Sequence, residues 1–163
     1  MLLIAYQGIY DGTNFEQIDV PAQITRAQRA GFSTMVDAWR VNGQMYLGAF
    51  QPITPVTDQY LQGNRFWINV MNVELQEWIV TQKPALYPNY FWYDVNNVPD
   101  YVTTSSGKLW TFGNEPINNS SIIFIPERED KGLLSTVKLR CYGICSSYVT
   151  LIKRMRNEGR WYL

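Results

Sequence analysis

The sequence contains no histidine among its 163 residues. The chain therefore lacks the side chain that most often moves protons at neutral pH and most often binds transition metals. This absence excludes Ser-His-Asp and Cys-His catalysis, and every zinc site that needs an imidazole ligand.

The sequence also lacks an excess of charge of either sign. Fourteen Lys and Arg balance 14 Asp and Glu, so no global field attracts nucleic acid or an anionic membrane. The apolar N-terminus, Met1–Tyr6, has no basic leader and is too short for a signal peptide or a membrane span. We therefore expect a cytoplasmic protein that is not secreted by a signal peptide and binds neither nucleic acid nor membranes.

Cysteine is scarce, and glycine-rich phosphate loops are absent. Cys141 and Cys145 cannot make a four-thiolate site. Their spacing would allow a disulfide only with cooperative local geometry, so we expect two reduced thiols. These observations predict no cofactor and no zinc held by thiolates.

Hydrophobic residues make up 46% of the chain and aromatic residues 15%, including six Trp and eleven Tyr. This composition is globular, and the length suits one domain over residues 1–163. The rings would either fill the core or form an aromatic contact surface, since Tyr and Trp are favoured at interfaces. Many of them lie in strand-like runs, which favours the core.

Strand-like and helix-like segments alternate along the chain. Asp19 is expected to cap the first helix, with Pro21 inside its first turn. The pair Asn42-Gly43 predicts a type I′ hairpin after the second strand. This alternation predicts a parallel α/β sheet or barrel. We expect strands near 2–6, 32–39, 44–48, 65–70, 90–93, 101–104, 109–112, 121–126 and 142–145, and helices near 19–30, 73–82 and 146–158.

Several segments, taken in order, resemble the glycerophosphodiester phosphodiesterase-like family. They are VDAWRVNGQMYLG at 36–48, FWINVMN at 66–72, WTFG at 110–113 and GICSSY at 143–148. The resemblance covers essentially the whole chain. It implies a short TIM-barrel-type α/β fold with a β-hairpin after strand two, in which some helices are replaced by loops or missing. The site of such a barrel lies at the carboxyl ends of the strands.

The reaction of this family uses a His-Arg pair after strand one, carboxylates that hold a divalent metal, a second His and a Lys. The resemblance implies that these positions are depleted here. Of the strand-one His-Arg-Gly only Gly8 remains, and of the strand-two Glu-x-Asp only Asp37 remains. The strand-three His and Lys fall at Asn69 and Met71. The other family positions fall at Tyr6, Gln7, Ile18, Asp19, Ala49 and Tyr93.

The resemblance therefore implies a pseudoenzyme with no catalytic residues and no bound metal, because one carboxylate with neighbouring amides binds a divalent cation poorly. Asp37 is a residual family position. Our leading hypothesis is an inactive phosphodiesterase-like domain that serves as a binding or structural module, with protein partners or self-assembly, for example in a virus particle. One alternative is a divergent metal-dependent hydrolase that uses Asp37 with Asp19 or Asp94. Another is a barrel that kept a ligand pocket without the chemistry. No spacing forces any two of Asp94, Asp100, Glu115 and Glu127 together at one rim.

Overall fold

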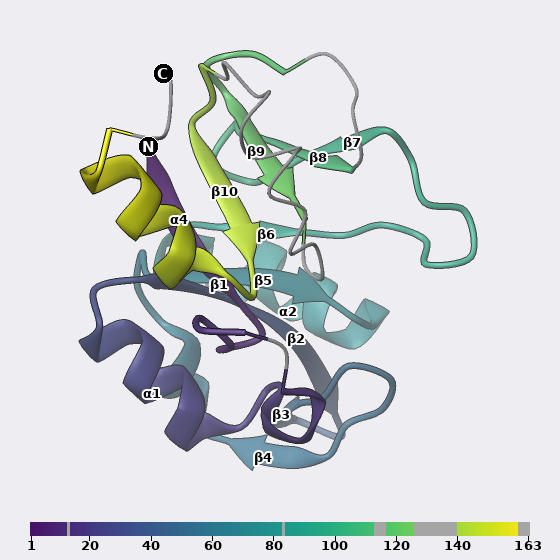
Figure 1. Ribbon diagram of the computed structural model, residues 1–163. Coiled ribbons are helices and arrows are strands. Elements are labelled where there is room, and N and C mark those ends of the chain that lie inside the picture. The colour runs from purple at the N-terminus through teal and green to yellow at the C-terminus, as the bar shows by residue number, and fades with distance from the viewer. Residues whose placement is uncertain (13, 83, 113–116, 126–139, 160–163) are drawn as a thin grey trace.

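The computed structural model describes residues 1–12, 14–82, 84–112, 117–125 and 140–159. These residues form a mixed α/β structure in which one curled sheet makes a partial barrel (Figure 1). The chain was expected to form a short barrel-like α/β fold, and the partial barrel agrees with that expectation at this level. The parallel strands, in the order in which they pair, are β6 (Tyr90–Phe91), β5 (Phe66–Val70), β2 (Ser33–Val41), β1 (Leu2–Tyr6), β10 (Gly143–Ser146), β9 (Ser121–Phe124) and β8 (Leu109–Phe112).

The predicted hairpin follows β2. Strand β2 runs on past β1 and pairs antiparallel with β3 (Gln44–Leu47), which in turn pairs with β4 (Thr54–Val56). Asn42 and Gly43 both have positive φ angles, as a type I′ turn requires. The carboxylate of Glu74 accepts hydrogen bonds from both of their backbone N–H groups. A second antiparallel pair joins β7 (Tyr101–Thr103) to β8.

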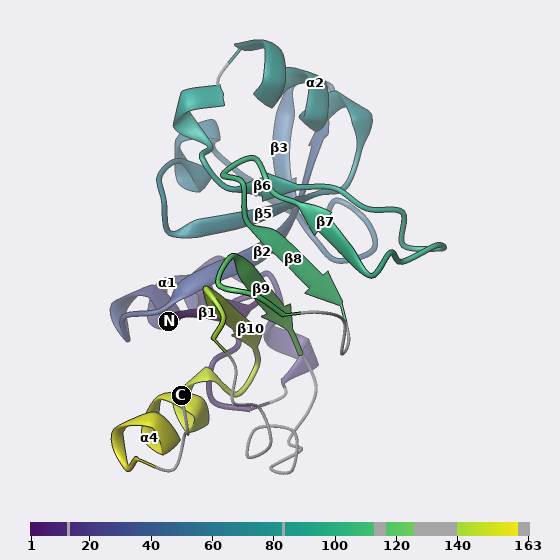
Figure 2. The same cartoon turned by 90° about the horizontal axis from the view of Figure 1, so that it is seen from above.

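Among the described residues, three α-helices accompany the parallel strands (Figures 1 and 2). They are α1 (Pro21–Arg29), α2 (Val73–Gln82) and α4 (Val149–Asn157). Leu75 and Ile79 of α2, four positions apart, and Ile152 and Met155 of α4, three apart, are buried on one face of each helix. No helix in the described part of the chain is long and apolar enough to cross a membrane.

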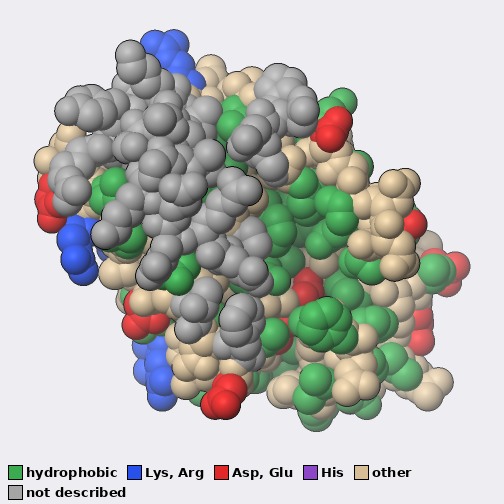
Figure 3. Space-filling view, turned by 45° about the vertical axis from the view of Figure 1, so that its right-hand side comes forward, with side chains coloured by type: hydrophobic (Ala, Val, Ile, Leu, Met, Phe, Trp, Pro, Cys, Tyr) green, Lys and Arg blue, Asp and Glu red, His purple; other side chains and the backbone are tan. Residues whose placement is uncertain are grey.

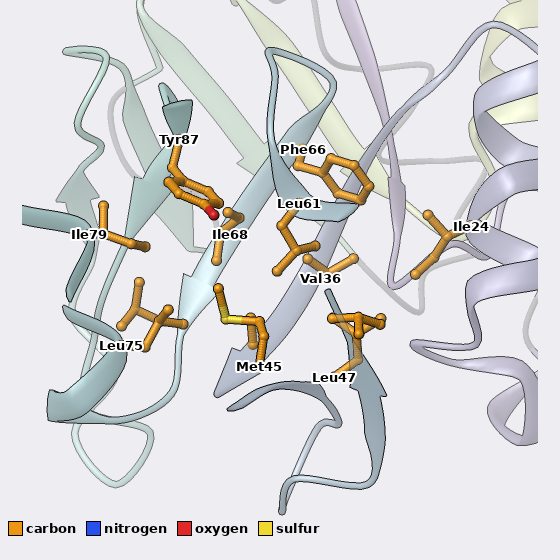
Figure 4. Close-up of a cluster of buried hydrophobic side chains, with 13 residues drawn as sticks. Ile24, Val36, Met45, Leu47, Leu61, Phe66, Ile68, Leu75, Ile79 and Tyr87 are labelled. Atoms are coloured by element: carbon orange, nitrogen blue, oxygen red, sulfur yellow. The ribbon is translucent and has the colours of Figure 1, made fainter. Parts of the chain in front are cut away.

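The alternation of side chains along the strands separates an interior cluster of buried side chains from two outer clusters. Val36 and Ile68 point outward and pack with Leu75 and Ile79 of α2 in one buried cluster (Figure 4). The intervening residues point into the barrel, because successive strand side chains face opposite sides. The interior cluster consists of Ile4, Met35, Trp67, Phe91, Trp110, Ile122 and Cys145.

This interior cluster supports the core interpretation for part of the aromatic content. Trp67 and Trp110 are buried, and the ring of Phe91 stacks on Trp110 at 4.3 Å between centroids. Cys141 and Cys145 are both free thiols. The charged segment 127–131, expected to be a solvated loop, lies outside the described residues.

Candidate functional site

Polar side chains meet at the carboxyl ends of the parallel strands. Tyr6 ends β1, Asp37 lies in β2, Asn69 lies in β5 and Tyr93 follows β6. Asp37 and Asn69 are register partners in the parallel β2–β5 pair. Both continue the inward-facing alternation set by Met35 and Trp67, so their side chains close the end of the hydrophobic interior.

Asp37 is the centre of this cluster, and its carboxylate is held by two amides. The Nε2 of Gln7 donates to its Oδ2 at 2.5 Å, and the Nδ2 of Asn69 donates to its Oδ1 at 2.8 Å. Asp37 is only 5% exposed. The two side chains that donate to this carboxylate, Gln7 and Asn69, are therefore neutral amides. The resembled family has Arg and His at these two positions.

The backbone after β1 places Gln7 over the barrel end. Gln7 has φ +50° and Gly8 has φ +84°, so the chain turns sharply directly after the strand. A Cβ atom on Gly8 would lie 2.9 Å from the Cγ1 atom and 3.1 Å from the backbone N of Ile24 in α1. Only glycine permits this approach. This close approach gives position 8 a structural reason to be glycine.

Asp19 does not cap helix α1 as the sequence predicted. The N-cap residue is Val20, and no side chain caps the helix. Asp19 instead has φ +53°, and its Oδ1 accepts a hydrogen bond from the backbone N–H of Asp37 at 3.3 Å. Its own N–H donates to the carbonyl of Gln7. These contacts turn the carboxyl group towards the strand end and away from the helix.

The other oxygen of Asp19, Oδ2, is buried without a hydrogen-bond partner among the described residues. Burial raises the pKa of Asp19 well above its ordinary value, and the nearby Asp37 raises it further. Burial also raises the pKa of Asp37, to about 6, against the opposing effect of the hydrogen bonds from Asn69 and Gln7. The two carboxyl groups form a buried pair that resists full ionisation.

Two tyrosines complete the polar end of the barrel. Burial and the charge of Asp37 raise the pKa of Tyr6 well above its ordinary value, and the same two effects raise the pKa of Tyr93 to about 12. Both phenols therefore stay neutral at physiological pH.

A pocket of about 400 Å³ opens at this end of the barrel. Asp37 and Asn69 lie at its polar side, while Phe50, Trp92 and Val95 are exposed. The Nε1 of Trp39 donates to the carbonyl of Gly48 at 2.6 Å, which ties the hairpin to this wall. The described residues that line the pocket are Tyr6, Gln7, Asp37, Trp39, Ala49, Phe50, Asn69, Val70, Met71, Trp92, Tyr93, Asp94 and Val95.

The structure brings most of the family positions named from the sequence to this pocket. Asp94, considered as a partner for Asp37, is an exposed residue of its lining. Glu115 and Glu127 lie outside the described residues. Sequence reasoning missed Trp39 and Trp92 as lining residues. Trp39 follows Asp37 by two positions in a strand, so period-two alternation could have placed it on the same face.

The donor set fits a divalent cation poorly. Such cations prefer six or more oxygen ligands, with several from carboxylates. No group of three or more Asp, Glu, Cys or His side chains arranged to hold a metal occurs in the described part of the chain. Both oxygens of Asp37 accept amide hydrogen bonds, and the raised pKa of Asp19 favours its neutral form.

A comparison of the chain with profiles of known protein families, with characterised proteins and with solved structures finds no match.

Proposed function

We propose that this chain is a catalytically inactive barrel of the phosphodiesterase-like type, retained as a binding module. The resemblance of segments 36–48, 66–72, 110–113 and 143–148 supports the family assignment. The sequential order of the parallel strands on each side of β1 supports a short TIM-type barrel. Fold alone does not define a function, so the site has to carry the proposal.

The observation that carries it is the environment of Asp37. The family reaction needs cations against the phosphoryl group, a metal and proton-transfer groups. Here the carboxylate accepts hydrogen bonds from Gln7 and Asn69, and the nearby hydroxyls are phenols that stay neutral. A pocket remains while the groups that would perform the reaction are replaced by neutral ones, which favours binding without turnover.

The setting that we propose is a larger assembly, such as a virus particle, with protein partners or self-assembly. The exposed apolar side chains Phe50, Ile53, Trp92, Val95 and Val98 support it, because aromatic and apolar groups are favoured at interfaces. Size-exclusion chromatography with light scattering tests the proposal. We expect a self-associated form or a partner that co-purifies, and a strict monomer with no partner would contradict this setting.

One observation favours a second candidate, a divergent metal-dependent hydrolase that uses Asp37. Asp19 leaves its Oδ2 buried and without a partner among the described residues, close to the backbone of Asp37. A buried carboxylate oxygen without a hydrogen bond is costly and is a candidate ligand atom. In this reading Asp19 and Asp37, with Asp94 at the rim, would bind the cation.

Thermal melts with and without Mg²⁺, Ca²⁺ or Mn²⁺ separate the two candidates. A metal that binds the native state raises the melting temperature by mass action. We expect no shift. A metal-dependent rise that Asp37→Ala or Asp37→Asn abolishes, and that the exposed-site control Asp100→Ala retains, would overturn the inactive-barrel proposal. The isosteric Asn variant keeps the test decisive if the Ala variant does not fold.

A further inference from the structure

The electrostatic character of the pocket is opposite to the one that a phosphate site needs. No lysine or arginine is among the described residues that line it, whereas Asp37 and Asp94 are. Arg40 follows Trp39 in β2 but is engaged elsewhere, in a 3.0 Å ion pair with Asp58 and over the ring of Trp78. Figure 3 shows hydrophobic side chains beside acidic ones over much of one described face, with Lys and Arg at its left and upper margins.

The carboxylate of Asp37 has no cationic partner in the described structure. Its hydrogen bonds come from neutral amides, and it is almost completely buried. A charge in such a position acts through a lower dielectric than water and is weakly screened. A cation placed in the pocket would therefore be attracted even without touching the carboxylate.

Aromatic rings form much of the rest of the pocket. Trp92 is 59% exposed and Phe50 is 91% exposed, and neither has a ring partner among the described residues. The remaining aromatic lining residues are Tyr6, Trp39 and Tyr93. The faces of Trp, Tyr and Phe rings attract cations, and cages of such rings recognise quaternary ammonium groups.

Taking the binding function proposed above as given, we propose that this pocket binds an organic ammonium ion. The positive head lies among the aromatic rings, over the end of the barrel where Asp37 supplies the negative charge. The volume of about 400 Å³ admits such a head together with an attached chain. Anionic phosphodiesters are disfavoured because they would meet two carboxylates and no described cation.

Isothermal titration calorimetry tests the proposal with choline and with its neutral analogue 3,3-dimethylbutan-1-ol (dimethylbutanol below), in which a tert-butyl group replaces the trimethylammonium group. The two have nearly the same shape, so the difference reports charge. We expect choline to bind at least about tenfold more tightly than dimethylbutanol. A ratio of this size is expected when a cation is shielded from water among aromatic rings and near a carboxylate. Equal binding of both, or binding of neither, overturns the proposal.

Three variants locate the interaction. Trp92→Leu should weaken choline binding roughly two- to fivefold, as loss of one exposed cation–aromatic contact does. Tyr101→Leu removes a comparably exposed ring outside the pocket and should leave binding unchanged. Asp37→Asn should reduce the preference for choline over its neutral analogue. Unchanged binding in both Trp92→Leu and Asp37→Asn would contradict the assignment to this pocket.

The same samples distinguish failure of this inference from failure of the proposed function. If choline does not bind better than dimethylbutanol while the melts stay independent of metal, the cation proposal fails and the inactive barrel stands. If the melts depend on metal through Asp37, the inactive-barrel proposal itself fails.

Discussion

At the residue scale, the buried carboxyl groups of Asp19 and Asp37 couple the barrel to pH. Desolvation raises the pKa of both, from an ordinary value of 3.8 to about 6 in the case of Asp37. Between pH 3.8 and about pH 6, the Asp37 carboxyl group has lost its proton in the unfolded chain but keeps it in the folded chain. The unfolded state then binds fewer protons, so the free energy of unfolding falls as pH rises.

This stabilisation is fully present below about pH 4 and is lost as pH rises through about pH 6. The contribution of Asp37 amounts to at most about 3 kcal/mol, from a shift of roughly two pKa units. Asp37→Asn should flatten the pH dependence of stability over this range. Urea unfolding at a series of pH values measures it.

The matched control is Asp100→Asn, which removes an exposed carboxylate away from the pair. We expect it to keep the pH dependence of the parent chain. The informative quantity is the slope of the unfolding free energy against pH. The absolute stability changes as well, because the new Asn side chain would place its own N–H group against one of the two amides that donate to the native carboxylate. A parent chain whose stability rises steadily over this range, with the same slope in Asp37→Asn, would contradict the raised pKa values.

The same residues show how far sequence reasoning reaches at this scale. The resemblance placed Gln7, Asp37 and Asn69 at the barrel end, and the structure brings them together. Asp19 was expected to cap helix α1, because an Asp two residues before a Pro satisfies the local rule. The backbone N–H of Asp37, 18 residues later, holds its carboxyl group instead. A contact that distant is not encoded in the local sequence.

At the element scale, the end of strand β3 fixes the hairpin wall of the pocket. The N–H of Gly48 donates to the carbonyl of Asp37, and its own carbonyl accepts from the indole of Trp39. Gly48 has φ +155°, and a Cβ atom on it would fall onto the backbone carbonyl oxygen of Gln51. A larger residue therefore forces the segment that leads to Ala49 and Phe50 to move.

We expect Gly48→Ala to lower the free energy of unfolding by more than about 2 kcal/mol and to weaken binding in the pocket, because backbone atoms cannot yield as a flexible side chain can. Gly31→Ala is the control. Gly31 also has a positive φ, but an added Cβ would meet nothing within 4 Å, so the strain alone should cost about 1 kcal/mol. Urea unfolding compares the two, and equal losses would contradict a steric role for Gly48.

Elements specified by local signals were the ones that the sequence predicted. The Asn42-Gly43 turn, helix α2 and the β7–β8 pair all lie where the pattern indicated. Strand β4 was missed, because its residues Thr54–Val56 include Pro55 within a stretch that was expected to be a connection. It forms because β3 offers a free edge, and Pro is tolerated in a strand at the edge of a sheet. The formation of β4 therefore depends on the neighbouring strand β3 and not on the sequence of the segment itself.

At the scale of the whole molecule, the sheet is held across one gap by a ring stack and by a hydrogen bond from the turn between β7 and β8. Strands β6 and β8 are not paired with each other. Phe91 of β6 instead stacks on Trp110 of β8, and the backbone N–H of Ser105 donates to the carbonyl of Tyr90. The residues that follow β6, Trp92 and Tyr93, line the pocket. The ring stack therefore connects the interior core to the proposed binding site.

Trp110 is fully buried, yet its Nε1 has no hydrogen-bond partner among the described residues. Trp110→Ala should cost about 3–5 kcal/mol, as removal of a large buried ring does. Trp110→Phe keeps a ring against Phe91 and removes a buried donor that has no partner, so the loss should be less than half as large. Trp110→Ala should also weaken binding in the pocket, because β6 loses the ring that holds it next to β8. Urea unfolding and choline titration of both variants measure these effects. A loss in Trp110→Phe equal to that in Trp110→Ala would show that the indole N–H stabilises the fold and that the barrel interior contains a partner for it.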